Sequence, residues 1–177
     1  MDSYDDIAHY YDDLFNEHID IAENRAIAAM LTPYLYNKTI LDIGCGTGLL
    51  LELFTLDPKK YVGIDPSEKM LDIAREKFKF FEFRQEKFEH YIGFTDVAVS
   101  LFGSVSYIHW DVYEKITQVC NKYFLMFYKE DYEPKTYYKT QKHFKHYDLT
   151  YYDLFNGFPN AEILSFQNFY IVTNMFV

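Results

Sequence analysis

Apolar residues follow two patterns along this chain, and the two patterns alternate. Where they recur every three or four positions, as at Ile27, Ala28 and Leu31, they predict a helix, and where they run together they predict a buried strand. The predicted helices are Ile19–Leu35 (stopping near Pro33), Gly48–Thr55, Glu68–Phe78 behind a Ser67 cap, Asp111–Lys122 and Thr150–Asn156. The predicted strands are Thr39–Ile43, Tyr61–Ile64, Phe80–Phe83, Asp96–Leu101, Tyr123–Tyr128, Ala161–Phe166 and Phe169–Val177.

Helices separate the early strands, whereas only Gln167 and Asn168 separate the last two. Parallel strands need long crossovers, and helices supply them, so the alternation predicts an α/β fold with helices on both faces of a mostly parallel sheet. The two-residue connection predicts a C-terminal antiparallel hairpin instead. Ligands of such sheets bind at the carboxyl ends of the strands, which makes the loops there the first candidates for a site.

A glycine cluster follows the first predicted strand, in the run LDIGCGTG over Leu41–Gly48. Glycines let the chain turn sharply and let a ligand approach the backbone, and the helix after them offers free N–H groups. The spacing is not that of a dinucleotide site, because Leu49 stands where the third glycine is required, and no phosphate-binding P-loop motif is present. The alternative is a tight turn without a ligand.

Asp65 ends the second predicted strand, about 20 residues after the first loop glycine. An acid at that distance accepts hydrogen bonds from both hydroxyls of a ribose. The alternative is a turn residue before Pro66. Together with the glycine cluster, Asp65 predicts a ribose-bearing nucleoside ligand that lacks a pyrophosphate.

Several segments resemble the successive motifs of class I S-adenosylmethionine-dependent methyltransferases. They are LDIGCGTG, VGIDPSEKML (Val62–Leu71), DVAVSLFGSVSYI (Asp96–Ile108) and the opening YDDIAHYYD (Tyr4–Asp12). The stretch SLFGSVSYI is similar to that of amine N-methyltransferases acting on amino sugars and small amines. The resemblance extends over essentially the whole chain. It implies a Rossmann-like, seven-stranded sheet, the cofactor S-adenosyl-L-methionine and the product S-adenosyl-L-homocysteine.

The same resemblance implies the residues of the cofactor site. Gly44 and Gly46 would line the methionine and ribose, Asp42 would orient their loop, and Asp65 would hold the ribose hydroxyls. The complete set of implied contacts is Tyr11, Asp42, Gly44, Cys45, Gly46, Asp65, Pro66, Met70, Glu86, Lys87, Phe88 and Leu101. Residues 85–88 depart from the family pattern, because Lys87 stands where the family usually has an acid that recognises the adenine. Either Glu86 serves there, shifted by one residue, or the backbone of Lys87 and Phe88 does.

Methyl transfer from a sulfonium needs close positioning of the acceptor more than it needs an acid or a base. An amine acceptor has only to be neutral, while a hydroxyl acceptor needs a base such as a histidine. Tyr11 and His109 are the candidate catalytic residues. The competing interpretations are a packing aromatic for Tyr11 and a surface or capping histidine for His109. His9 is open to the same two interpretations as His109.

Charge narrows the choice of acceptor. The 17 basic residues against 27 acids give a net charge of −10, which disfavours a nucleic-acid partner. Residues 129–147 are the exception. Their combination of lysines and aromatic residues suits the binding of single-stranded nucleic acid, although one solvated helix face explains this composition equally well. The acidic residues of 1–24 favour an amine-bearing substrate. A small-molecule acceptor is therefore the first expectation, and a nucleic-acid- or protein-modifying enzyme or a noncatalytic binding module is the alternative.

Composition supports one domain in a reducing compartment. Half of the residues are hydrophobic (49%), so a large core is available, and the two cysteines lack the spacing of disulfide frameworks or metal ligands. No metal site is expected. No apolar run is long enough to span a bilayer and the opening residues are acidic, so we expect a cytoplasmic protein. Within the domain we expect an N-terminal arm and helix (1–37), a cofactor-binding core (38–129), a substrate-side insertion (130–148), and a last helix with the hairpin (149–177). The sequence does not predict the oligomeric state.

Overall fold

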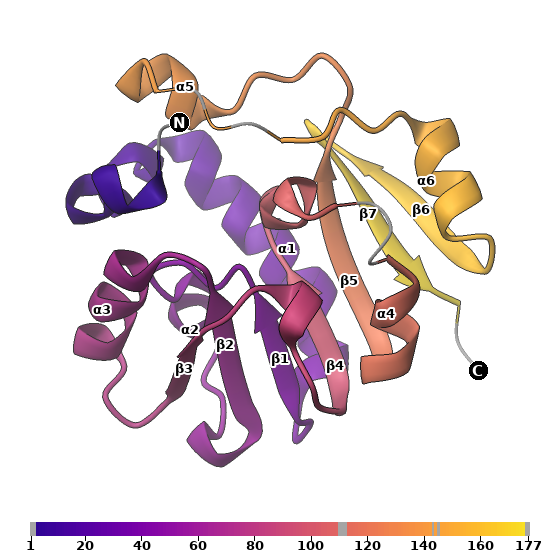
Figure 1. The fold of residues 1–177 in the computed structure, drawn as a ribbon, viewed down its shortest axis with the longest axis horizontal. Helices are drawn as coiled ribbons and strands as arrows, with labels where there is room; N and C mark the ends of the chain where they lie inside the picture. Colours follow the sequence, from indigo (N-terminus) through magenta and orange to yellow (C-terminus); the bar gives the residue numbers. More distant parts are fainter. Residues whose placement is uncertain (1–2, 110–112, 143, 145, 176–177) are drawn as a thin grey trace.

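One seven-stranded sheet organises the protein, in the order β3-β2-β1-β4-β5-β7-β6 (Figure 1). The computed structural model describes residues 3–109, 113–142, 144 and 146–175. The strands are β1 (Ile40–Ile43), β2 (Tyr61–Asp65), β3 (Glu82–Gln85), β4 (Thr95–Ser100), β5 (Cys120–Tyr128), β6 (Ala161–Phe166) and β7 (Phe169–Asn174). β1 to β5 pair in parallel, and β7 runs antiparallel to both of its neighbours. The predicted α/β fold with its C-terminal hairpin is confirmed.

Helices cover both faces of the sheet. They are α1 (His18–Leu35), α2 (Leu49–Leu53), α3 (Glu68–Lys77), α4 (Tyr113–Val119), α5 (Lys135–Thr140) and α6 (Tyr151–Gly157). The first three pack on one face in a core that includes Leu31 and Leu50, and α4 and α6 pack on the other around Ile116 and Leu154. No described helix combines the length and the apolar character needed to cross a membrane.

Strand register brings three loops to one edge of the sheet. Ile43 of β1 pairs with Ile64 of β2, so Gly44, which follows β1, and Asp65, the last residue of β2, come at the same level. β1 also pairs with β4, whose last residue is Ser100. The glycine loop, Asp65 and the loop after β4 therefore meet at the carboxyl ends of the central strands, where α/β sheets bind ligands.

Two predicted strand starts were wrong. β3 begins at Glu82, two residues later than predicted, because Phe80 lies exposed in the turn while Phe81 packs against Tyr61 at a ring distance of 5.5 Å. β5 begins at Cys120, inside the predicted helix, since the strand extends to pair with Thr95 of β4. The start of that predicted helix, at Asp111, lies outside the described residues.

Helix α1 ends at Leu35, two residues past Pro33, as the pattern predicted. A proline removes one hydrogen bond of the helix, but the helix goes on for two more residues. Leu31 and Leu35 both lie in the core, so packing of this face holds the last turn in place.

The segment 129–147 is not the single solvated helix face that its lysines suggested. Among its described residues only Lys135–Thr140 is helical, and Phe144 is buried and stacks on Tyr4 with ring centroids 4.4 Å apart. Lys142 pairs with Asp6 at 3.4 Å and Lys139 pairs with Glu17 at 3.2 Å. Opposite charges thus dock this segment on the N-terminal arm, and the two lie at the same end of the molecule in Figure 1.

Candidate functional site

The glycine loop is fixed to β2 by its own backbone. The N–H groups of Gly44 and Cys45 both donate to the carbonyl of Ile64, at 2.8 and 3.1 Å. Gly44 and Gly46 have φ values of +69° and +53°, a backbone region that residues other than glycine adopt only with strain. Ser104, from the loop after β4, donates its hydroxyl to the carbonyl of Gly44 at 3.2 Å. Strand ends on both sides therefore hold the loop in one conformation.

Asp65 joins the glycine loop to the start of α3. Its Oδ2 accepts the N–H of Gly46 at 3.0 Å, and its Oδ1 accepts the N–H of Ser67 at 2.8 Å. Desolvation raises the pKa of Asp65 to about 6, although these two hydrogen bonds oppose the rise. Each carboxylate oxygen keeps further acceptor capacity, so the pair can receive two hydroxyl groups of a ligand.

The N-terminal arm, residues 3–17, covers this loop. Asp12 accepts the hydroxyl hydrogen bond of Thr47 at 2.6 Å and pairs through its other oxygen with Lys77 at 3.0 Å. Asp5 accepts from the hydroxyl of Ser67 at 2.5 Å. Ile7 and Leu14 of the arm are buried in one cluster with Met70 and Phe144. Side chains of α3 and of the segment 129–147 thus hold the arm above the carboxyl ends of the strands.

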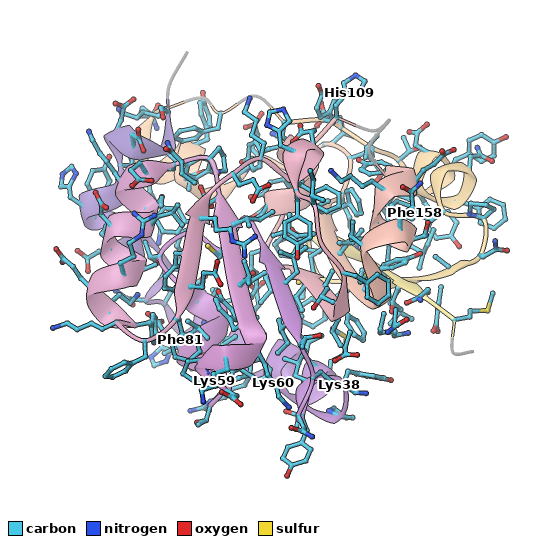
Figure 2. The ribbon with its side chains drawn as sticks, turned by 60° about the horizontal axis from the view of Figure 1, so that its bottom comes forward. Lys38, Lys59, Lys60, Phe81, His109 and Phe158 are labelled. Atoms are coloured by element: carbon cyan, nitrogen blue, oxygen red, sulfur yellow. The ribbon has the colours of Figure 1, made fainter. Side chains whose placement is uncertain are left out.

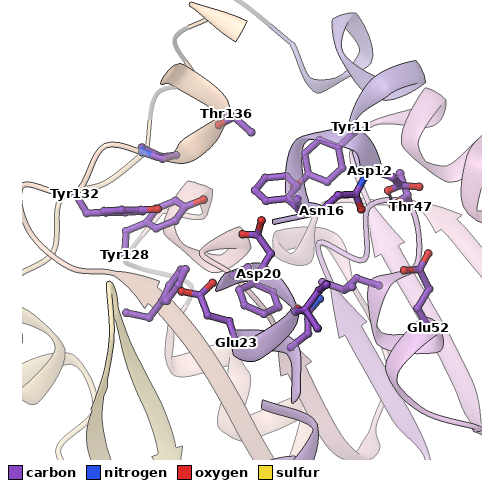
Figure 3. Close-up of a pocket in the computed structure, with 17 residues that line it drawn as sticks. Tyr11, Asp12, Asn16, Asp20, Glu23, Thr47, Glu52, Tyr128, Tyr132 and Thr136 are labelled. Carbon is purple, nitrogen blue, oxygen red and sulfur yellow. Dashed lines mark hydrogen bonds between the residues drawn. The ribbon is translucent and has the colours of Figure 1, made fainter. Parts of the chain in front are cut away.

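A cavity of about 230 Å³ lies between the arm, α1, the glycine loop and the ends of β4 and β5 (Figure 3). Its lining residues are Tyr11, Asp12, Phe15, Asn16, Asp20, Ile21, Glu23, Asn24, Thr47, Leu49, Glu52, Phe102, Tyr128, Tyr132, Pro134, Thr136 and Phe169. Thr47 and Leu49 belong to the glycine loop and the helix after it, so the cavity adjoins the cofactor candidate site directly. It is smaller than the roughly 300 to 1,000 Å³ of pockets for drug-sized ligands, which restricts its occupant to a small molecule.

Comparison with known proteins identifies the family. Residues 40–124 match the family model described as a methyltransferase domain. A protein of Geobacillus sp. (strain WCH70) that carries a methyltransferase name is 32% identical over 106 residues, which are 55% of this chain and 43% of that protein. Residues 40–124 belong to the methyltransferase domain family, and the chain is similar to S-adenosylmethionine-dependent methyltransferases. It spans less than half the length of that Geobacillus relative.

Solved methyltransferase structures share the fold at low identity. Magnesium protoporphyrin IX methyltransferase from Synechocystis PCC 6803, with bound S-adenosylhomocysteine, superposes with a TM-score of 0.63 over 94% of this chain and 91% of that chain, at 15% identity. The Haloferax volcanii protein solved with the Trm112 methyltransferase activator superposes with a TM-score of 0.73 over 99% and 98% of the two chains, at 13% identity. Both likenesses concern the fold alone.

Four of the residues predicted for the cofactor site or for catalysis come together in the structure. Gly44, Gly46 and Asp65 form the loop, and Tyr11 lines the adjoining cavity. Burial raises the pKa of the Tyr11 hydroxyl, and nearby Tyr107, Asp65 and Asp12 raise it further. The Tyr11 hydroxyl therefore stays protonated and acts as a hydrogen-bond donor rather than as a base.

The residues predicted to contact adenine occupy different surroundings. Met70 is buried under the arm, and Phe88 is buried in the core on the α4 side of the sheet. Pro66 and Lys87 are exposed, and the N–H of Glu86 donates to the carbonyl of Asp65 at 3.2 Å. Of the adenine candidates, Pro66, Glu86 and Lys87 are thus the ones near Asp65 that core packing leaves accessible.

Three further predicted residues lie apart from the cavity wall. His109 is exposed at the edge of the molecule, with its ring 5.4 Å from that of Tyr147, and it does not line the cavity (Figure 2). Cys45 and Leu101 are buried in the core beside α1 and α2. His109 therefore has no geometric support as a base for a substrate in this cavity.

Asp42 supports the loop from below. It is buried, and its Oδ2 accepts the hydroxyl of Tyr61 at 2.8 Å. Burial raises the pKa of Asp42 to about 7; the Tyr61 hydrogen bond opposes this rise and the charge of Asp65 adds to it. Because no ligand can reach Asp42, we assign it to positioning the loop.

We expect Asp42→Asn to flatten the pH dependence of stability. The pKa of Asp42 is about 7 in the folded chain and near 3.8 in the unfolded chain, so the folded state holds an extra proton between about pH 4 and pH 7. Stability from this group is thus present at low pH and is lost as the pH rises through that window. Urea unfolding at pH 4 and pH 7 should show that the free energy of unfolding falls less with rising pH in the variant than in the unaltered protein. An equal fall in both proteins would contradict the assignment.

Sequence reasoning missed Asp20 and Glu23, which line the cavity from the first turns of α1. A signal for them was available. Glu23, Ile27, Leu31 and Leu35 recur at four-residue spacing, so the acid continues the buried apolar stripe of the helix. A charged residue on the buried face of a helix is uncommon, and it marks a candidate functional position.

Proposed function

We propose that this chain binds S-adenosylmethionine at the glycine loop and Asp65 and transfers its methyl group to a small-molecule acceptor in the adjoining cavity. The observation that carries the proposal is the juxtaposition of a loop open to a ligand, the two acceptor oxygens of Asp65 for a ribose, and a small cavity beside them. The acceptor atom is an amine nitrogen or a hydroxyl oxygen.

The loop fits the cofactor. A Cβ built on Gly46 would meet no heavy atom within 4 Å, so space lies open above this backbone, whereas the same atom on Gly44 would meet Ser104 at 2.5 Å. Gly46 would thus face the methionine and ribose part of the ligand, and Asp65 would accept its two hydroxyl hydrogen bonds. When bound, S-adenosylmethionine supplies an electrophilic methyl group on a sulfonium and departs as S-adenosylhomocysteine.

The cavity walls supply positioning and exclusion of water. Phe102, Tyr128 and Phe169 form an aromatic wall, and Tyr11 closes the side toward the arm. Such a wall holds the nucleophile close to the methyl carbon, at the roughly 3 to 3.5 Å that displacement requires.

The nucleic-acid alternative loses the observation that favoured it. Lys139 and Lys142 of the segment 129–147 contact Glu17 and Asp6 of the arm, and Phe144 is buried. These side chains dock the segment on the arm, so they are not arranged as a free basic and aromatic surface.

Transfer of radiolabelled methyl from S-adenosylmethionine to a panel of small amines, phenols and alcohols tests the proposal. We expect labelled product from part of the panel, and a loss of rate in Tyr11→Phe, which keeps the ring and removes the donor. Asp12→Asn is expected to leave the acceptor preference unchanged, because Asp12 is already engaged by Thr47 and Lys77. Label that enters only RNA or protein would contradict a small-molecule acceptor.

A further inference from the structure

The loop after β4 holds an aromatic residue in a backbone conformation that favours glycine. Phe102 has a φ of +48° and Gly103 has a φ of +83°. The N–H of Ser104 donates to the carbonyl of Leu101 at 3.2 Å, which closes these four residues into a turn. Turns with a positive φ at both central positions are dominated by glycine, asparagine and aspartate. A phenylalanine at the first central position is therefore an exception that needs a physical reason.

The other non-glycine residues with positive φ are of a different kind. Among the described residues they are Asn37, Asp131, Gln141 and Gln167, and all four are polar and exposed. Phe102 is instead partly buried and packs against the core on the α1 side of the sheet. In a residue that has a Cβ, this backbone region lowers the ratio of folded to unfolded molecules by a factor of roughly 5 to 30. The chain thus carries a strain at Phe102 that glycine would relieve.

Neighbouring elements fix this turn from both sides. The N–H of Gly103 donates to the carbonyl of Met126 in β5 at 3.1 Å. The hydroxyl of Ser104 donates to the carbonyl of Gly44 in the glycine loop at 3.2 Å. A Cβ on Gly103 would clash with the ring of Tyr128, so this ring lies directly against the backbone of the turn. The turn therefore cannot relax without moving the glycine loop or the end of β5.

The strained turn joins the two candidate binding regions. Phe102 lines the cavity proposed for the acceptor, together with Tyr128 and Phe169. Its ring meets that of Phe169 edge-on, with the ring centroids 5.8 Å apart. The same turn is bonded to Gly44, beside which the methionine part of the cofactor would lie. One short, rigid turn thus connects the proposed cofactor loop to an aromatic ring in the wall of the acceptor cavity.

We propose that Phe102 is a specificity-determining residue whose ring sets the largest methyl acceptor that the cavity admits. This inference rests on the proposed function, in which the cavity is the acceptor site. A ring held on a rigid turn does not give way to a larger molecule, and a close-packed wall rejects an acceptor that overfills it. The substrate class that fits is a compact amine or alcohol with a short aliphatic chain or a single ring. The strain at Phe102 is retained because glycine and asparagine, which would relieve it, have no ring.

Phe102→Ala and Phe102→Gly test the strain by urea unfolding. Both variants remove the ring, and only glycine relieves the backbone. We therefore expect Phe102→Gly to have the larger ratio of folded to unfolded molecules, by roughly 5- to 30-fold. Phe15 is the matched control, because it is also a partly buried phenylalanine that lines the cavity, and its φ is not positive. There the alanine variant should be at least as stable as the glycine variant. Phe102→Ala as stable as Phe102→Gly would overturn the inference.

Calorimetric titration with acceptors of graded size, at saturating S-adenosylhomocysteine, tests the role of the ring. The probes are methylamine, butylamine, benzylamine and 1-naphthylmethylamine, and the alcohols of the same skeletons. In the unaltered protein we expect the naphthyl probes to bind at least roughly tenfold more weakly than the best smaller probe, and in Phe102→Gly about twofold or less. A general loss of structure would weaken all probes alike, whereas removal of the limiting ring changes their ratio. Phe80→Gly, at an exposed phenylalanine that does not line the cavity, should leave the ratio unchanged.

Three results of the titration would overturn the inference. They are tight binding of the naphthyl probes by the unaltered protein, an equal ratio in Phe102→Gly and the unaltered protein, and no binding of any probe by either protein. The same titrations without S-adenosylhomocysteine separate this inference from the proposed function. If S-adenosylhomocysteine does not bind while the probes still show the change in ratio, the proposed function is wrong and the role of Phe102 in the cavity stands.

Discussion

Replacing Asp65 with alanine is expected to weaken S-adenosylhomocysteine binding by about 1 to 3 kcal/mol, or roughly 5- to 150-fold. The variant removes the carboxylate that would accept both ribose hydroxyls, and it leaves the N–H groups of Gly46 and Ser67 without their present acceptor. Calorimetric titration measures the affinity, and thermal unfolding of the ligand-free variant separates a binding loss from a folding loss.

Asp57→Ala is a matched control for this variant. Asp57 and Asp65 flank β2 at its two ends, and each accepts the N–H of the residue two positions on, Lys59 for Asp57 and Ser67 for Asp65. Only Asp65 is at the carboxyl end of the sheet, so Asp57→Ala should leave the affinity unchanged. Affinity should also decrease below about pH 6 in the unaltered protein, as Asp65 takes up a proton. Unchanged binding in Asp65→Ala would place the ribose elsewhere.

Alanine at two neighbouring glycines is expected to give two different results. At Gly46 it should cost about 1 to 2 kcal/mol of unfolding free energy, from backbone strain alone. At Gly44 it should cost about 2 to 5 kcal/mol, since the new Cβ adds a steric clash to a similar strain. The structural reason is that a Cβ on Gly44 would lie 2.5 Å from that of Ser104, whereas a Cβ on Gly46 would meet nothing within 4 Å.

Ser104→Gly isolates the clash. In the double variant with Gly44→Ala, the obstructing Cβ is gone, and about 1 to 3 kcal/mol should be recovered relative to Gly44→Ala alone. Urea unfolding of the two single variants and the double variant measures this recovery. Gly46→Ala should fold and yet bind S-adenosylhomocysteine weakly, because its Cβ occupies the space proposed for the ligand. Equal destabilisation at both glycines would contradict the loop geometry.

The parts of the site that the sequence predicted are local in the chain. Gly44, Gly46 and Asp65 stand at the ends of two short apolar runs, and parallel pairing of β1 with β2 is sufficient to bring them together. The sheet could be predicted from the sequence in the same way, because each central strand is a largely apolar segment between helices. Boundaries failed where packing overrode pattern, as at Phe80, whose ring is exposed although it stands in an apolar run.

The acceptor cavity could not be predicted in the same way. Its walls come from the arm, α1, the end of β5 and the segment 129–147, and only the folded chain brings Asp20 within one cavity with Tyr128 and Thr136. The acids of residues 1–24 suggested a negative lid, but the structure divides them. Asp5, Asp12 and Glu17 hold the arm in place through hydrogen bonds and ion pairs, and Asp20 and Glu23 line the cavity.

Calorimetric titration of the purified protein with S-adenosylmethionine and S-adenosylhomocysteine, with NAD as the comparison, tests the central claim most directly. The glycine spacing and the carboxylate of Asp65 predict saturable binding of S-adenosylmethionine and S-adenosylhomocysteine. They predict no binding of NAD, because the glycines are not spaced to receive its pyrophosphate. Absence of binding by both S-adenosyl ligands, or equal binding of NAD, would contradict the assignment of this loop as an S-adenosylmethionine site.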